Sequence, residues 1–142
     1  MTVLLRRDFV VGVPRSVAWD YLARLAEWPR WAQHIRRVEV YPAGNLSAGT
    51  SGTIHLRNGI RSTFRMIEFR PQENWKWSGP FLWLDVHYDH RFEPIDEQKT
   101  RLVLVLEAQG IGVSVFGRLF ALMYARNLDA AIPRLIRLME SR

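Results

Sequence analysis

The stretch GIGVSVFGRLFALMYARNLDAAIPRLIRLME, residues 110–140, decides the fold because its apolar residues change to helical spacing and keep that spacing to Glu140. We therefore expect one long helix after Gly110 and Gly112. Pro133 lies inside it and should bend its axis, because proline has no backbone N–H to donate. The expected apolar face comprises Phe116, Phe120, Met123, Tyr124, Leu128, Ile132, Leu135 and Met139.

The chain before this helix has the pattern of an antiparallel meander. Asn58-Gly59 is its strongest hairpin signal, because both positions of a type I′ turn need a positive φ. Gly79-Pro80 and residues 94–97 mark further turns. About six or seven strands are expected, over residues 3–13, 38–41, 54–57, 61–69, 75–78, 82–92 and 101–109.

Two short helices are expected after the first strand. Pro14 can begin a helix over residues 15–26, in which Val17, Tyr21 and Leu25 fall on one face. Pro29 can begin a second short helix that continues to about residue 35. We expect Trp28 and Trp31 to pack these helices against the sheet.

Composition places limits on what the chain can be. Its 142 residues, 48% of them hydrophobic, suit a single domain over residues 1–142. No apolar run approaches the roughly 20 residues of a membrane span, and MTVLLRRDF has no signal pattern. The absence of cysteine excludes disulfides and thiolate chemistry. We therefore expect a soluble, cytoplasmic protein.

The charge is basic but dispersed. The net charge is +6, and the arginines are scattered from Arg6 to Arg142 with no run longer than two. This distribution argues against DNA as a partner, although weak attraction to anionic membranes or RNA is compatible with it.

The order of elements predicts an internal cavity. A twisted sheet of this length can wrap one long helix, and a helix of about 40 Å cannot fill the whole concave side. Large apolar and aromatic side chains would line the remaining space, as they do in most ligand pockets.

Five local motifs point to a family: Pro14 with Trp19–Leu22, Trp28–Trp31, Gly49–Gly52, Glu68–Pro71 and His90–Pro94. With these motifs and this order of elements, the chain resembles the START-like, helix-grip superfamily, which includes polyketide cyclase/dehydrase and lipid-transport proteins. The resemblance implies an α+β fold, a curved antiparallel sheet on a long C-terminal helix, and a ligand-binding cavity. Members bind lipids, sterols, polyketides or hormones, and some catalyse cyclisation or dehydration.

Residues 82–93 hold the most informative candidates. Alternation places Leu84, Val86, Tyr88, His90 and Phe92 on one face, which we interpret as the inner one. His90 and Tyr88 would then be polar groups at the edge of an apolar cavity, able to hydrogen-bond a ligand. The alternative for His90 is a bond to a nearby carbonyl.

The opposite face of this segment is polar. Asp85, His87 and Asp89 share it, and we interpret the row as the solvated side of the sheet. His87 and His90 are three residues apart on a strand and should point to opposite sides, so no metal site or other cofactor is predicted.

The remaining ligand-binding candidates come from other elements. Trp75 and Trp77 share a face and should point inward. Arg65 lies in a strand for which the pattern leaves open which face is inside; if inward, it would pair with a ligand carboxylate. The amino-terminal half of the long helix is unusually apolar and is expected to border a ligand entrance, where it would also favour transient contact with a membrane. Its candidates are Phe116, Phe120 and Tyr124.

Three functions remain open from the sequence. The cavity favours binding, and transport, of a hydrophobic or aromatic small molecule such as a lipid, a quinone or a polyketide-like compound. An alternative is a polyketide cyclase/dehydrase-type enzyme, in which His90 would be the catalytic acid or base. A second alternative is a basic module that contacts a ribosome, RNA or a membrane. No pattern distinguishes a monomer from a homodimer.

Overall fold

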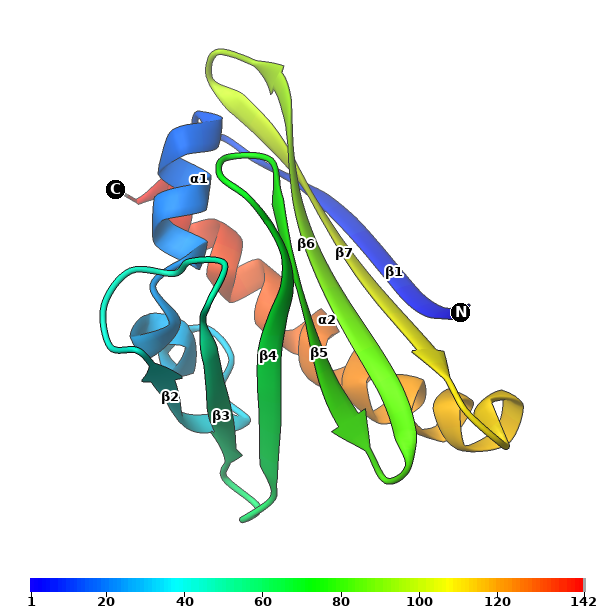
Figure 1. Ribbon diagram of the computed structural model, residues 1–142. Coiled ribbons are helices and arrows are strands. Elements are labelled where there is room, and N and C mark those ends of the chain that lie inside the picture. The colour runs from blue at the N-terminus through cyan, green and yellow to red at the C-terminus, as the bar shows by residue number, and fades with distance from the viewer. Residues whose placement is uncertain (142) are drawn as a thin grey trace.

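Seven antiparallel strands form one sheet in the order β1-β7-β6-β5-β4-β3-β2 in the computed structural model, which describes residues 1–141. Figure 1 shows the sheet curving around the long C-terminal helix α2. The strands are β1 (Thr2–Val11), β2 (Ile35–Tyr41), β3 (Ser51–Leu56), β4 (Arg61–Arg70), β5 (Asn74–Phe81), β6 (Leu84–Asp96) and β7 (Lys99–Gln109). The helical elements are α1 (Arg15–Leu22), the 3-10 helix η1 (Leu25–Arg30), the π-helical turn η2 (Val113–Gly117) and α2 (Arg118–Glu140).

This arrangement confirms the predicted helix-grip α+β fold. Strands β2 to β7 follow one another as a meander, and β1 pairs with β7 to form one edge of the sheet. The predicted turn at Gly79-Pro80 is wrong, because both residues lie within β5. The chain reverses two residues later, at Leu82, which has a positive φ of 57°.

The β3–β4 hairpin forms where Asn58-Gly59 predicts it, but its turn is of another type. The amide of Leu56 donates to the carbonyl of Ile60, so the loop contains the three residues 57–59. Gly59 alone has a positive φ, of 92°, whereas a type I′ turn needs two such residues. The side-chain oxygen of Asn58 accepts a hydrogen bond from the Ile60 amide and favours this longer loop.

The second short helix lies earlier in the chain than predicted. Pro29 is inside η1 rather than at its start, and β2 already begins at Ile35. The indole Nε1 of Trp28 donates to the carbonyl oxygen of Leu22 at 2.9 Å. This bond holds the helical turn against the end of α1.

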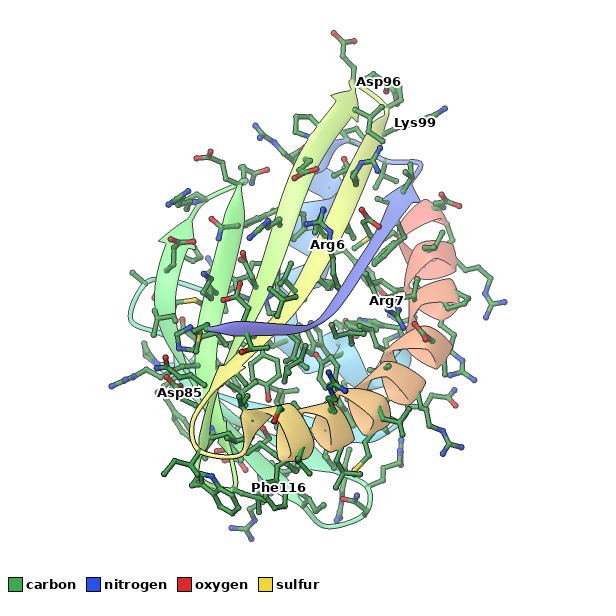
Figure 2. The ribbon with its side chains drawn as sticks, turned by 90° about the vertical axis from the view of Figure 1, so that its right-hand side faces the viewer. Arg6, Arg7, Asp85, Asp96, Lys99 and Phe116 are labelled. Atoms are coloured by element: carbon green, nitrogen blue, oxygen red, sulfur yellow. The ribbon has the colours of Figure 1, made fainter. Side chains whose placement is uncertain are left out.

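Helix α2 lies along the concave side of the sheet and is continuous through Pro133. Figure 2 shows it curved rather than straight. Its outer side is tied to β1 by a bidentate pair, in which Arg7 Nε donates to Asp129 Oδ1 at 2.7 Å and a terminal nitrogen donates to Oδ2 at 3.1 Å.

Aromatic side chains fill most of the space between the sheet, α1, η1 and α2. Trp19 packs on Trp75 with 5.2 Å between ring centroids, and Trp28 packs on Trp77 with 5.5 Å. The predicted role of Trp28 in packing the short helices on the sheet is therefore confirmed. The buried aromatic residues of this core are Trp19, Tyr21, Trp28, Trp31, Phe64, Trp75, Trp77 and Phe92.

Candidate functional site

His90 lies on the inner face of β6, where the alternation of this strand places it. Leu84, Val86 and Phe92 are buried on the same face, and Tyr88 is partly buried. The interpretation of this face as the inner one is confirmed.

The imidazole of His90 packs against two indoles of β5. Its ring centroid is 4.8 Å from that of Trp75 and 4.8 Å from that of Trp77. Nδ1 donates to the carbonyl oxygen of Trp75 at 3.2 Å, so the lone pair of the neutral ring is on Nε2. Burial lowers the pKa of His90 to about 4, so the ring is neutral at pH 7.

Two small cavities adjoin His90. One has a volume of about 40 Å³ and the other of about 20 Å³. His90, Tyr124, Leu104 and Leu128 border both of them. The larger cavity is also lined by Leu22, Trp28, Trp31, Ala32, His34, Ile35 and Ala131.

The predicted cavity is therefore much smaller than expected. A space of about 40 Å³ holds a few water molecules, whereas pockets for organic ligands usually measure roughly 300–1,000 Å³. The expectation that one helix would leave the concave side partly empty is wrong, because the tryptophans of α1, η1 and β5 occupy that space.

Polar groups that could bind a ligand lie in the walls of this site. Burial raises the pKa of the Tyr124 hydroxyl to about 12, so it stays protonated and able to donate. The buried indole nitrogens of Trp31 and Trp75 have no hydrogen-bond partner. A buried donor without a partner is costly, and a ligand oxygen would relieve that cost.

The sequence predicted Trp31 only as a packing residue. Trp31 lines the cavity with His90 because of how the 3-10 turn and the start of β2 place it. No spacing of residues in the sequence predicts this position. The candidate site defined by His90, Tyr124 and Trp31 therefore contains two predicted residues and one that sequence reasoning missed.

Other predicted residues adjoin this site or lie farther along the interior. Trp75 and Trp77 point inward as expected and are buried. Tyr88 and Phe120 pack near Tyr124, with 5.8 Å between the Tyr88 and Tyr124 ring centroids. Leu84 and Val86 belong to a separate apolar cluster and do not border either cavity.

Two predicted residues lie outside this interior site. Arg65 is exposed on the convex side of the sheet, because Phe64 and Met66 take the inner positions of β4. The inward alternative for Arg65 is thus wrong. Phe116 is partly exposed at the end of the molecule, where its ring packs on Trp83 rather than on the site.

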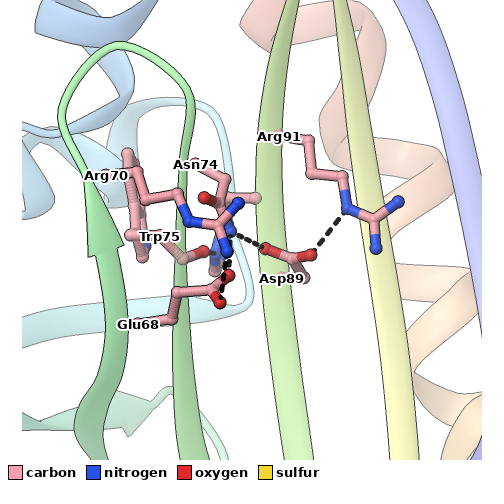
Figure 3. A network of polar contacts seen from close by, with 7 residues as sticks. Glu68, Arg70, Asn74, Trp75, Asp89 and Arg91 are labelled. Atoms are coloured by element: carbon pink, nitrogen blue, oxygen red, sulfur yellow. Dashed lines mark hydrogen bonds and ion pairs between the residues drawn. The ribbon is translucent and has the colours of Figure 1, made fainter.

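The polar face of β6 is only partly solvated. Asp89 is buried, contrary to our interpretation, and it accepts hydrogen bonds from Asn74 Nδ2 at 2.9 Å and from Arg91 Nε at 2.7 Å. Figure 3 shows this network on the convex side, where Asn74 also donates to Glu68.

Within residues 1–141, no group of three or more histidine, aspartate or glutamate side chains is arranged to hold a metal ion.

A curved antiparallel sheet that grips one long helix is the helix-grip fold of the START-like class of domains. The chain belongs to the polyketide cyclase / dehydrase and lipid transport family, whose sequence profile matches residues 2–140. No curated protein matches the chain significantly in sequence.

Solved structures share this fold at low sequence identity. The hypothetical protein jhp0584 of Helicobacter pylori superposes with a TM-score of 0.78 at 14% identity, over 94% of this chain and 86% of that one. The Zhui aromatase/cyclase of Streptomyces sp. R1128 gives 0.73 at 16% identity, over 97% and 93%. A START superfamily protein of Mycobacterium smegmatis gives 0.68 at 14% identity, over 96% and 99%.

None of the helices in the part of the chain that the structure describes has the length and apolar character needed to cross a membrane.

Proposed function

We propose that the protein binds a flat, largely apolar molecule with at least one carbonyl or hydroxyl oxygen, in the site around His90, Tyr124 and Trp31. The observation that carries this proposal is the buried indole N–H of Trp31, which has no partner and belongs to a residue lining the cavity beside His90. Aromatic walls favour flat rings, and the polar groups supply one acceptor and two donors.

The chemistry of the ligand follows from these groups. The Nε2 atom of neutral His90 accepts a hydrogen bond, whereas the Trp31 indole and the Tyr124 hydroxyl donate. A lipid, a quinone or a polyketide-like compound presents such oxygens on an apolar body. The family description supports the lipid and the polyketide-like compound. Binding would gain roughly 25 cal/mol for each Å² of apolar surface removed from water.

Binding requires the site to expand. The 40 Å³ cavity lies against α2, to which Tyr124, Leu128 and Ala131 belong. Outward movement of residues 118–124 of α2, which precede the ion pair between Arg7 and Asp129, would enlarge this space. We therefore expect binding to be slow relative to diffusion, because the open state must form first.

Two tricyclic probes test the proposal. Anthracene has no polar atom, whereas 1,8-dihydroxyanthraquinone has the same ring system with carbonyl and hydroxyl oxygens. We expect micromolar binding of the quinone probe. Trp31→Phe should weaken quinone binding about three- to tenfold, as loss of one hydrogen bond predicts, and should change anthracene binding less than twofold.

Trp83→Phe is the matched control. Its indole donates to the carbonyl oxygen of Ile111 at the end of the molecule, away from the cavity. Equal losses in Trp31→Phe and Trp83→Phe, or no binding of either probe by the unmodified protein, would count against the proposed site. Native mass spectrometry of protein purified from its own host would then show whether a bound apolar compound exists at all.

A second candidate function is catalysis of the aromatase/cyclase type. The Zhui protein with this fold is an aromatase/cyclase, and His90 is the one histidine of this chain that borders both cavities. A ring with a pKa of about 4 is a weak base at pH 7, however, and this favours binding over proton abstraction. Catalysis predicts that His90→Ala abolishes turnover of a poly-β-ketone substrate while probe affinity stays within about threefold.

A further inference from the structure

We propose that one end of the molecule docks onto the surface of an anionic lipid bilayer. This end, the docking surface, is formed by the β5–β6 turn, the segment after β7 and the first turns of α2. Its apolar residues are largely exposed, with Ile111 at 88%, Leu122 at 64% and Leu119 at 53% of full exposure. The docking surface comprises Leu82, Trp83, Ile111, Val115, Phe116, Leu119, Leu122 and Met123.

These residues form one surface although they come from two parts of the chain. The indole Nε1 of Trp83 donates to the carbonyl oxygen of Ile111 at 2.7 Å, and its ring packs edge-on against Phe116 with 5.0 Å between centroids. Figure 1 shows the β5–β6 turn and the start of the C-terminal helical segment at the same end of the molecule, and Figure 2 shows Phe116 there.

These apolar side chains are not needed to pack the core of the fold. On α2, Ala121, Leu128 and Leu135 make the buried face, whereas Leu119 and Leu122 lie on the opposite, exposed face. An apolar residue scattered singly on a surface is ordinary, but eight of them at one end form a contiguous patch of the kind that marks a binding surface.

The local charge identifies the partner. From residue 110 to residue 128 there are two arginines, Arg118 and Arg126, and no aspartate or glutamate. Asp85, which follows the β5–β6 turn, is hydrogen-bonded to His87 and Gln109. Both arginines are exposed beside the apolar residues, and the whole chain carries a net charge of +6. Cations beside exposed apolar and indole side chains suit the interface of an anionic bilayer, where phosphates and acyl chains lie within a few ångströms of each other.

A second copy of the chain fits this surface less well. In a two-fold dimer the same surface lies on both sides, so Arg118 and Arg126 of one copy would be buried against a surface that carries the same two arginines. The segment 110–128 offers no acidic side chain to pair with them. The surface therefore favours lipid headgroups over self-association.

Vesicle flotation tests this inference independently of any ligand. We expect the unmodified protein to float with vesicles of phosphatidylcholine containing about a third phosphatidylglycerol, with at least tenfold weaker binding to phosphatidylcholine alone. The double variant Leu119→Ser/Leu122→Ser should lose at least tenfold in binding to the anionic vesicles. Arg118→Gln/Arg126→Gln should lose most of the preference for anionic lipid.

Ile60→Ser/Ile95→Ser is the matched control, because both isoleucines are exposed but lie at other hairpin turns. It should bind vesicles within twofold of the unmodified protein. Absence of flotation with anionic vesicles would overturn the inference, and so would a dimer in sedimentation equilibrium that the Leu119/Leu122 variant dissociates. Flotation does not depend on whether the tricyclic probes bind. The membrane inference and the proposed ligand site can therefore be refuted independently of each other.

Discussion

His90 Nδ1 donates to the main-chain carbonyl of Trp75 at 3.2 Å, and the two residues are directly paired across β5 and β6. The sheet itself therefore selects the tautomer, because the strand register places the acceptor opposite the imidazole. The other ring nitrogen remains an acceptor at the candidate site. Burial keeps water away from a protonated His90, and this desolvation is the physical cause of its low pKa.

The pH dependence of stability should reflect this buried histidine. Its pKa is about 4 when folded and about 6.5 when unfolded. Between these values the unfolded state binds the extra proton, so the free energy of unfolding should fall as the pH is lowered from about 6.5 to about 4. The contribution of His90 is about 3 kcal/mol.

Urea unfolding at pH 7 and pH 4 of the unmodified protein and of His90→Gln measures this contribution. The unmodified protein should lose about 3 kcal/mol more than the variant, since other groups titrate in both. Burial also lowers the pKa of His34, so His34→Gln gives a separate estimate of its share. A His90 pKa near 6.5 by NMR would contradict the prediction.

Asp89→Asn should destabilise the convex side of the sheet. Both oxygens of Asp89 accept hydrogen bonds, from Asn74 and from Arg91, so an amide would place a donor against a donor. We expect a loss of about 2–3 kcal/mol in the free energy of unfolding. Asp85→Asn on the same strand is the control, because Asp85 is about half exposed, and it should cost less than about 0.5 kcal/mol. Chemical denaturation of both variants measures the difference.

Gly52→Ala should be strongly destabilising, although it adds one methyl group. A Cβ at this position would collide with the carbonyl oxygen of Glu39 and would lie 2.6 Å from the ring of Phe64. We expect a cost of at least about 2 kcal/mol, because neither the strand nor the buried ring can move freely. Gly49→Ala meets nothing within 4 Å and should leave the melting temperature unchanged or slightly higher. Equal melting temperatures for the two variants would refute the close packing of β2, β3 and β4.

The fold could be predicted from the sequence because each element has a periodic burial pattern. On β6, one face is buried along the strand, so alternate residues from Leu84 to Phe92 gave the correct inner face. On α2, the buried Leu128 and Leu135 recur at helical spacing. In both elements the buried positions repeat with the period of the strand or the helix, so the apolar residues repeat with the same period in the sequence.

The face of β4 could not be predicted because its period is broken. The pairing with β5 shifts between Met66 and Glu68, and this irregularity lets Phe64, Met66 and Phe69 all point inward. Strict alternation would place Phe69 on the same side as Arg65. A sequence pattern does not reveal which residue a bulge inserts, so the inward alternative for Arg65 could be rejected only from the structure.

The volume of the site also lay beyond sequence reasoning. It depends on how the five buried tryptophans pack, and Trp31 reaches the site only through the conformation of η1 and the residues after it. The order of elements predicts a space between sheet and helix, but the side chains decide how much of it remains.

Enlarging the site should strengthen ligand binding while it weakens the fold. Leu128 is buried on α2 and borders both cavities, so Leu128→Ala should cost about 2–5 kcal/mol in stability and open additional space beside His90. Because the variant already has part of the space that the ligand needs, less free energy is required to expand the site. 1,8-Dihydroxyanthraquinone should therefore bind at least about fivefold more tightly. Leu135→Ala is the matched control, since Leu135 is the same residue type on the same helix, is fully buried and borders neither cavity. It should lose comparable stability without a gain in affinity. Calorimetric titration at a temperature where both variants are folded separates the two effects, and a similar gain in both would show that general loosening, rather than the site around His90, controls binding.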